Sequence, residues 1–219
     1  MANRPVYIAI ENFPFIKVVN VEFQFYSGFS DKQKRLSINS LHTAFLKLLP
    51  ERSVLEISSK SENPLGVKLS AFNLPVQIPD SDKFTVIESA YQGSKIFAGG
   101  EIFSDLMYQS PRNAKKDPRL KNSGALAGFQ FGKDKFPLEP KNFFYNWLYI
   151  TALVNQPELA AELLNYDAFT DIVFNPQKSV STQAMAAAVF VGLNRAGLIN
   201  SAVESKENFL KIVYQGKLK

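Results

Sequence analysis

A carboxylate, an amide and an amine in this chain have the spacing of neighbours on one face of an α-helix. Glu88, Gln92 and Lys95 lie four and three residues apart, which brings side chains together on a helix predicted over residues 84–98. Such a group is suited to acid–base chemistry. Thr85 and Glu88 also have the spacing of a capping box, in which the carboxylate only caps the helix, so both roles stay open for Glu88.

A second group of carboxylates lies later in the chain. Asp167, Thr170 and Asp171 fall in a predicted turn that precedes a short strand at residues 172–174. Carboxylates in a loop beside a strand are common in active sites, and they are equally common as turn formers. The pattern makes Asp167 and Asp171 candidates for a second functional carboxylate.

Basic residues follow a helix start at residue 110. Ser110 and Pro111 have the residue types preferred at the N-cap and the first helical position, and Arg112 and Lys115 come in the first turns. A helix N-terminus attracts anions, so this segment is a candidate seat for a pyrophosphate. A solvated basic turn is the alternative.

The composition excludes several kinds of chemistry. The chain has no cysteine and one histidine, His42, which excludes disulfides, thiol catalysis, Fe–S clusters and a histidine-rich metal site. His42 lies at the edge of an apolar helical stripe and is expected to be a boundary residue. We therefore expect no metal and no cofactor. The net charge of +5 and a pI near 9.2 permit an anionic ligand.

The elements predicted around these groups form a single domain of residues 1–219. Strands are expected near residues 19–25 and 54–57, and a helix begins after Ser30 and ends before Pro50. Further helices are predicted at 140–155, 157–165 and 182–198. Trp147, on the aromatic helix 140–155, is either a stacking platform for a flat ring or a core residue.

The chain contains no apolar run long enough for a membrane span, and its N-terminus lacks the apolar core of a signal peptide. These features predict a cytoplasmic protein that does not contact a membrane.

Four segments resemble motifs of the NADAR family (NAD and ADP-ribose associated). Residues 86–95 resemble the family's signature helix, residues 69–73 its Leu-Ser-Asn-Phe motif, and residues 110–116 its Ser-Pro-x-x-Ala-Lys helix start. Residues 155–164 are similar to its Asn-Pro-Glu-Leu segment. Asp167 or Asp171 falls where the family places an acidic residue.

Three departures from the family pattern bear on the substrate more than on the fold. Ser89 stands where the family has histidine after the glutamate, and Ala71 replaces the asparagine of the Leu-Ser-Asn-Phe motif. Residues 179–183 replace a Trp-Gly-rich end.

The resemblance implies an α+β fold that is mainly helical and contains a small sheet. The motifs place the NADAR-like core at residues 55–176. Residues 1–50 would then be an N-terminal β-β-α extension, and residues 177–219 a C-terminal helical segment.

The family's chemistry is cleavage of an N-glycosidic bond, in which positive charge develops on the ribose carbon. By resemblance, Glu88 stabilises that charge or activates water, and Asp167 or Asp171 assists. Lys95 protonates the leaving base, binds phosphate or captures the opened sugar as an imine. Residues expected to bind the ligand are Ser70, Phe72, Tyr91, Gln92, Arg112, Lys115 and Trp147.

The resemblance leaves three functions open. The first is removal of ADP-ribose from modified guanine in DNA, as antitoxin to a DNA ADP-ribosyltransferase, with ADP-ribosylated DNA, ADP-ribose and that toxin as partners. The others are hydrolysis of a small ribosylated metabolite, such as a riboflavin-pathway intermediate, and non-catalytic ADP-ribose binding. A basic run favours the first; its members are Arg112, Lys115, Lys116, Arg119 and Lys121.

Overall fold

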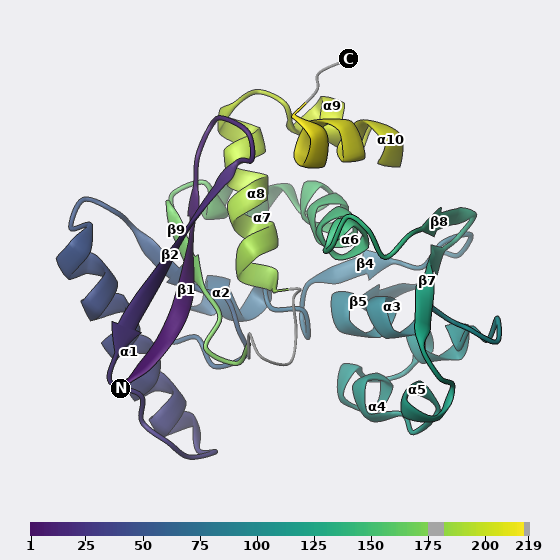
Figure 1. Ribbon diagram of the computed structural model, residues 1–219, viewed down its shortest axis with the longest axis horizontal. Helices are drawn as coiled ribbons and strands as arrows, with labels where there is room; N and C mark the ends of the chain where they lie inside the picture. The colour runs from purple at the N-terminus through teal and green to yellow at the C-terminus, as the bar shows by residue number, and fades with distance from the viewer. Residues whose placement is uncertain (175–181, 217–219) are drawn as a thin grey trace.

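The chain folds as an α+β protein in which small sheets alternate with helices (Figure 1). The computed structural model describes residues 1–174 and 182–216. Within these ranges the strands form three sheets, of four, two and three strands. Of the 179–183 segment, only the last two residues are described. The α+β class expected from the sequence is confirmed.

The four-stranded sheet lies on the side of the molecule that holds the N-terminus. The strands β1 (Ala2–Ala9) and β2 (Ile16–Phe23) form an antiparallel hairpin, and β1 also pairs with β9 (Ala168–Thr170). The strand β9 in turn pairs in parallel with β3 (Val54–Glu56). This sheet therefore joins the N-terminal hairpin directly to the strand that precedes Asp171.

The helix α1 (Asp31–Leu48) covers part of this sheet, and its start was correctly predicted. Ser30 is its N-cap, and its side chain accepts a hydrogen bond from the Gln33 backbone N–H. The apolar stripe of Ile38, Leu41 and Phe45 is buried in a core shared with β1 and β2.

Two central helices, α6 (Phe143–Val154) and α8 (Gln183–Arg195), pack against each other, and α8 also packs on β1 and β9. Both were predicted. A side chain at Gly192 of α8 would lie 2.5 Å from the carbonyl oxygen of Phe15 and 2.6 Å from that of Ile10. Only glycine allows the backbone of the β1–β2 hairpin to approach the helix so closely.

The remaining elements before α6 include the predicted catalytic helix, α3, and the short elements on either side of it in the chain. They are α2 (Pro64–Lys68), β4 (Pro75–Gln77), β5 (Phe84–Val86), α3 (Ile87–Gly93), β6 (Lys95–Phe97), the 3₁₀-helix η1 (Ser104–Tyr108), α4 (Pro111–Lys116), α5 (Arg119–Asn122), β7 (Leu126–Phe131) and β8 (Asp134–Phe136). The strand β4 pairs with β5, and β6, β7 and β8 form the three-stranded sheet. Figure 1 shows α3, α4 and α5 on the side opposite to α1.

The helix predicted over residues 84–98 is shorter than expected, and the capping box is wrong. The helix α3 covers only residues 87–93 and is flanked by strands. Its first N–H groups, those of Ile87 and Glu88, donate to the carbonyl oxygens of Leu74 and Ala71. Because the neighbouring turn satisfies these donors, no side chain caps the helix, and the Glu88 carboxylate is available for other partners.

The described part of the predicted C-terminal helical segment, residues 182–216, is helical, as predicted. After α8 it contains α9 (Ile199–Val203), α10 (Lys206–Phe209) and the π-helical turn η2 (Leu210–Tyr214). The helix predicted at residues 157–165 is α7 (Pro157–Leu163). The strand predicted at residues 172–174 is wrong, because the strand is β9, which ends at Thr170. The Asp171 carboxylate accepts the backbone N–H groups of Val173 and Phe174, which turns the chain there.

Candidate active site

Glu88 is a buried carboxylate with a donor at each oxygen. Gln92 Nε2 donates to Oε1 over 2.8 Å, and Lys115 Nζ lies 3.3 Å from Oε2. Gln92 is buried and lies one turn further along α3, whereas Lys115 reaches in from α4 and its side chain is 56% exposed. The structure therefore brings together three predicted site residues, with one oxygen of Glu88 held by a solvent-facing lysine.

Two lysines lie over aromatic rings beside this carboxylate. Lys95 Nζ is 5.4 Å from the centre of the Tyr91 ring, and Lys115 Nζ is 5.4 Å from that of Phe72. Burial lowers the pKa of Lys95, the charge of Glu88 opposes this effect, and the charge of Lys115 adds to it. The Lys95 ammonium therefore gives up its proton more readily than a surface lysine.

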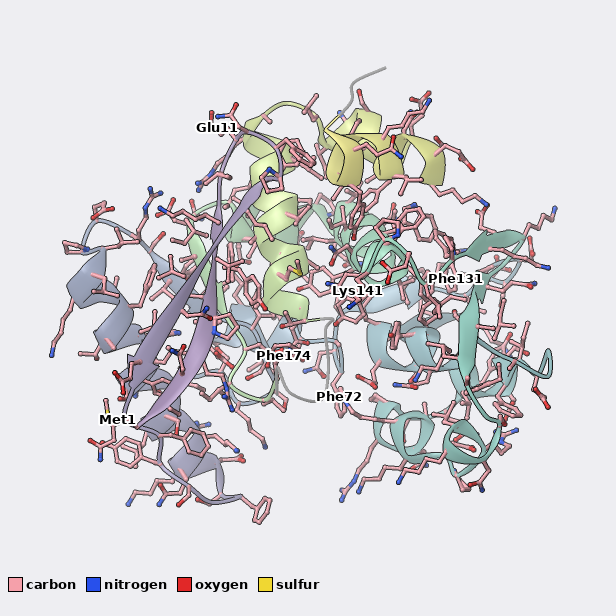
Figure 2. The ribbon with its side chains drawn as sticks, in the orientation of Figure 1. Met1, Glu11, Phe72, Phe131, Lys141 and Phe174 are labelled. Atoms are coloured by element: carbon pink, nitrogen blue, oxygen red, sulfur yellow. The ribbon has the colours of Figure 1, made fainter. Side chains whose placement is uncertain are left out.

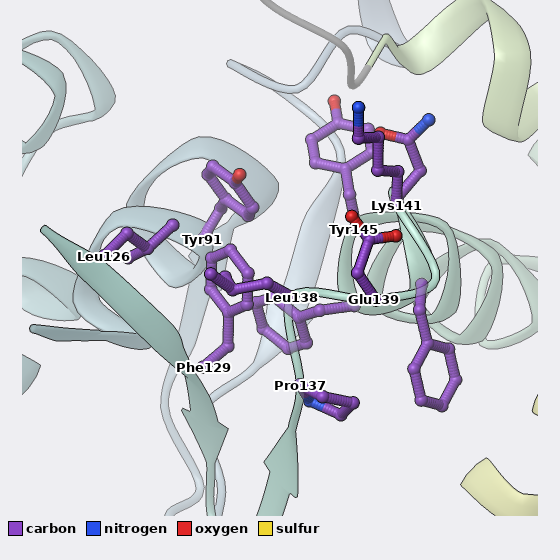
Figure 3. Close-up of a pocket in the computed structure, with 11 residues that line it drawn as sticks. Tyr91, Leu126, Phe129, Pro137, Leu138, Glu139, Lys141 and Tyr145 are labelled. Carbon is purple, nitrogen blue, oxygen red and sulfur yellow. The ribbon is translucent and has the colours of Figure 1, made fainter.

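A pocket of about 280 Å³ lies on the same side of α3: Tyr91, three residues after Glu88, lines it, although Glu88 is not among its lining residues. Figure 3 shows Tyr91, Leu126 and Phe129 on one side and Glu139, Lys141 and Tyr145 on the other. Aromatic rings dominate its walls: Phe129 stacks on Phe144 with ring centres 4.7 Å apart, and Tyr91 stacks on Phe144 at 6.0 Å. These walls suit a flat ring.

Tyr145 of α6 links the pocket to both candidate carboxylates. Its side chain is buried and meets Tyr91 edge-on, with ring centres 5.4 Å apart. Burial raises its pKa well above the usual value, and the negative charges of Glu88 and Asp171 add to this. The hydroxyl stays protonated at neutral pH and can serve as a hydrogen-bond donor. Sequence reasoning missed Tyr145, because it lies outside the four motifs.

Asp167 and Asp171 lie at opposite ends of β9, so the expectation that both precede a strand is wrong. Asp167 accepts hydrogen bonds from the backbone and side chain of Ser53, and its other oxygen is 3.0 Å from Arg195 Nη1. These bonds tie β9 to β3 and α8. Of the two aspartates, Asp171 is the one whose charge acts on Tyr145 together with Glu88.

Asp171 has a buried acidic neighbour that sequence reasoning missed. Glu56 of β3 accepts hydrogen bonds from the side chains of Ser58 and Thr170, both at 2.6 Å. Burial, and secondly the charge of Glu56, raise the pKa of Asp171 to about 7. A lone acid inside the apolar strand predicted at 54–57 was the available signal.

His42 lies at the boundary of the α1 stripe, as expected. Its Nε2 is 2.8 Å from Thr170 Oγ1, and burial lowers its pKa to about 4. The imidazole is therefore uncharged at neutral pH.

The raised pKa of Asp171 predicts a pH-dependent stability difference. Between about pH 4 and pH 7 the folded protein keeps a proton on Asp171 that the unfolded chain has lost, so this group destabilises the fold as the pH rises. We expect Asp171→Asn to gain stability relative to the wild type over that range. The titration of His42 makes the fold more stable as the pH rises, but it does so equally in the wild type and in the variant. It therefore cancels in the stability difference between them. Urea unfolding at pH 4.5 and 7.5 measures the free energy of unfolding of both proteins. If the wild type gains stability relative to Asp171→Asn between these pH values, the assignment is contradicted.

The basic run splits into free and paired residues. Ser110 is the N-cap of α4, as predicted, and Arg112 and Lys116 are exposed. Arg119 is held instead, because it lies 2.7 Å from a carboxylate oxygen of Asp105 and 2.9 Å from one of Asp117. Arg119 therefore does not belong with the cations available to a ligand.

Three ligand-binding candidates, Ser70, Phe72 and Trp147, are not among the residues that line the pocket. Ser70 is buried and donates a hydrogen bond to the carbonyl oxygen of Val67. Phe72 is in contact with Lys115 and lies near the middle of the molecule in Figure 2. Trp147 packs against Phe136 at 4.9 Å and is not among the residues that line the pocket. The stacking surface comes from α3, β7 and the start of α6 instead.

Across residues 1–174 and 182–216, no three histidine, cysteine or acidic side chains are grouped so that they could hold a metal ion. Over the same ranges, no helix has the length and apolar character to cross a membrane.

The α+β fold, with a buried carboxylate on α3 and an aromatic pocket lined by Tyr91 of the same helix, agrees with the NADAR resemblance of the motifs. The family model described as DarT1-associated NADAR antitoxin matches residues 2–219, and the chain belongs to this family. The match is wider than the 55–176 segment covered by the motifs and includes the N-terminal hairpin and α1. The family's name indicates association with the toxin DarT1, an ADP-ribosyltransferase. Among the curated proteins no match to this chain is found.

Proposed function

We propose that the protein is an N-glycosidase that removes ADP-ribose from modified guanine in DNA, and so acts as an antitoxin by reversing the toxin's modification. The observation that supports this most is the buried Glu88 carboxylate, which Gln92 and Lys115 hold on the helix whose Tyr91 lines an aromatic pocket. A nucleobase and the ribose carbon attached to it can occupy this arrangement.

The reaction breaks the bond between a base nitrogen and the ribose carbon. The bonding electron pair leaves with the base, and positive charge develops on the ribose carbon. Glu88 opposes that charge and takes a proton from the attacking water, whose oxygen forms the new bond to carbon. Lys95, with its lowered pKa, gives its proton to the departing nitrogen. Proton transfer from Glu88 to the amine restores both groups.

Asp171 and Tyr145 complete the proposed centre on the side facing α6. The Tyr145 hydroxyl donates to an oxygen of the substrate ribose, and Asp171 accepts from a ribose hydroxyl. With a pKa of about 7, Asp171 changes its charge near neutral pH, so this contact weakens as the pH falls.

The exposed cations of α4 and α5 provide the contact with DNA. Arg112, Lys116 and Lys121 are exposed, and α4 packs against α3, which carries Glu88. Phosphate contacts supply most of the affinity for nucleic acids and weaken with salt. The proposed DNA path therefore passes beside the catalytic helix, and this substrate favours action in the cytoplasm.

Cleavage of three substrates at two salt concentrations tests the proposal. We expect release of ADP-ribose from DNA modified on guanine, with a rate that falls steeply from about 50 to 200 mM salt. Cleavage of the free ADP-ribosylated nucleoside should change little. On DNA, Arg112→Ala should make the slope of log kcat/KM against log salt concentration about 1 less steep. Lys47→Ala, on the distant α1, should leave that slope unchanged. Hydrolysis of a ribosyl-pyrimidine from the riboflavin pathway, without cleavage of the DNA, contradicts the proposal.

A further inference from the structure

We infer that the pocket beside Glu88 holds the guanine base itself, and that Glu139 and Lys141 at its mouth recognise the base by its hydrogen-bonding edge. This inference rests on the proposed function and assigns the base-binding subsite within it. The alternative occupant is the adenine of the ADP-ribose group.

The place of the pocket favours the base that leaves. Tyr91 lines the pocket and follows Glu88 by three residues on α3, a spacing that separates Cβ atoms by about 5–6 Å. The leaving base is bonded directly to the reacting carbon. The adenine, in contrast, is separated from that carbon by a ribose, a diphosphate and a second ribose. A pocket this close to the catalytic carboxylate therefore matches the base.

The size and walls of the pocket fit one flat ring system. Its volume of about 280 Å³ lies just below the roughly 300–1,000 Å³ of sites for drug-sized ligands, so it is small for the whole of ADP-ribose. Tyr91, Phe129 and Phe144 form an aromatic wall whose rings pack on one another, and Tyr91 is the half-buried one of the three. A base of DNA reaches such a pocket only when it leaves the stack, and apolar contact with this aromatic wall compensates part of the cost.

The mouth of the pocket carries one carboxylate and one ammonium. Glu139 and Lys141 flank Pro140, just before α6, and both are exposed. Figure 3 shows both side chains on the α6 side of the pocket, with Tyr145. Within the described residues neither takes part in an ion pair or a side-chain hydrogen bond, so both remain available to a ligand.

This pair of charges complements guanine better than adenine. Guanine presents two adjacent donors, N1–H and the 2-amino group, which a carboxylate accepts with both oxygens. It also presents two adjacent acceptors, O6 and N7, which a lysine ammonium recognises. Adenine offers one amino group between the acceptors N1 and N7, so a carboxylate beside it meets repulsive lone pairs. Glu139 thus selects the donors of guanine, and Lys141 its acceptors.

Competition by short unmodified DNA tests the assignment, because such DNA is the product of the proposed reaction. The probes are three oligonucleotides of one sequence that carry guanine, hypoxanthine or adenine at the central position. Displacement of a labelled ADP-ribosylated oligonucleotide gives their affinities. We expect guanine to bind about tenfold tighter than adenine, with hypoxanthine, which lacks the 2-amino group, between them.

Two variants that each remove one charge test whether Glu139 and Lys141 cause the guanine preference. Glu139→Gln and Lys141→Met should each reduce the guanine preference to less than threefold. Glu158→Gln and Lys47→Met, at exposed positions on α7 and α1, are the matched controls and should keep it. Thermal melting checks that all four variants fold.

A folded Glu139→Gln protein that keeps the full guanine preference overturns the assignment, as does equal binding of guanine and adenine by the wild type. If the wild type cleaves ADP-ribosylated DNA in either case, the glycosidase function stands and only the subsite is wrong. If the wild type prefers guanine but does not cleave ADP-ribosylated DNA, the base subsite stands and the proposed activity is wrong.

Discussion

Glu88→Gln should lower kcat/KM on ADP-ribosylated DNA by about 10²–10⁴-fold, the usual range for loss of acid–base catalysis, and leave the fold intact. The amide keeps an oxygen that can accept the hydrogen bond from Gln92. It has no charge to oppose a cationic ribose carbon, and it cannot take a proton from water. The lost ion pair with the solvent-facing Lys115 should cost at most about 1 kcal/mol of stability.

The control for this variant is Glu158→Gln, which removes an exposed carboxylate from α7. Its kcat/KM should equal that of the wild type, and the melting temperatures of the three proteins should agree within about 4 °C. Turnover within threefold of the wild type by a folded Glu88→Gln protein removes Glu88 from the catalytic role.

Replacement of Lys95 should have the second largest effect. Lys95→Met should lower kcat on the same substrate by about 10²-fold or more, because the leaving base then departs without a proton. Lys95→Arg distinguishes proton donation from binding by charge: arginine keeps the positive charge but does not release its proton at these pH values. We therefore expect the arginine variant to be as inactive as the methionine variant.

The pH profile provides an independent measurement of the same role. Because burial lowers the pKa of Lys95, wild-type activity should decrease as the pH rises through that lowered value, before the range in which a surface lysine titrates. Full rescue of activity by Lys95→Arg would show that Lys95 acts through its charge alone, for example on a phosphate.

The sequence was sufficient for the local elements with clear periodicity or caps. The α1 stripe, the Ser110 helix start and the helices near 143–154 and 183–195 all depend on contacts between residues close in the chain. The spacing of Glu88 and Gln92 also predicted their contact correctly. These features were predictable because i, i+4 neighbours are fixed by the helix itself.

The predictions that were wrong or absent have a common physical cause, which is contact between segments far apart in the chain. The capping box failed because the turn at residues 71–74 supplies the carbonyl oxygens that receive the first N–H groups of α3. The strand at residues 172–174 failed because pairing with β1 and β3 fixes β9 four residues earlier. Tyr145 and Glu56 were missed for the same reason, since only the fold brings them near Asp171.

The most direct test of the central claim is to identify which bond the protein breaks. An oligonucleotide with ADP-ribose on one guanine is incubated with the wild type and with Glu88→Gln, and the masses of the products are measured by mass spectrometry. We predict that the wild type yields free ADP-ribose and an oligonucleotide with its guanine intact, and that Glu88→Gln yields neither at a comparable rate. A product that keeps the ribose or a phosphoribose on the base, or an oligonucleotide that has lost the guanine, would contradict the account.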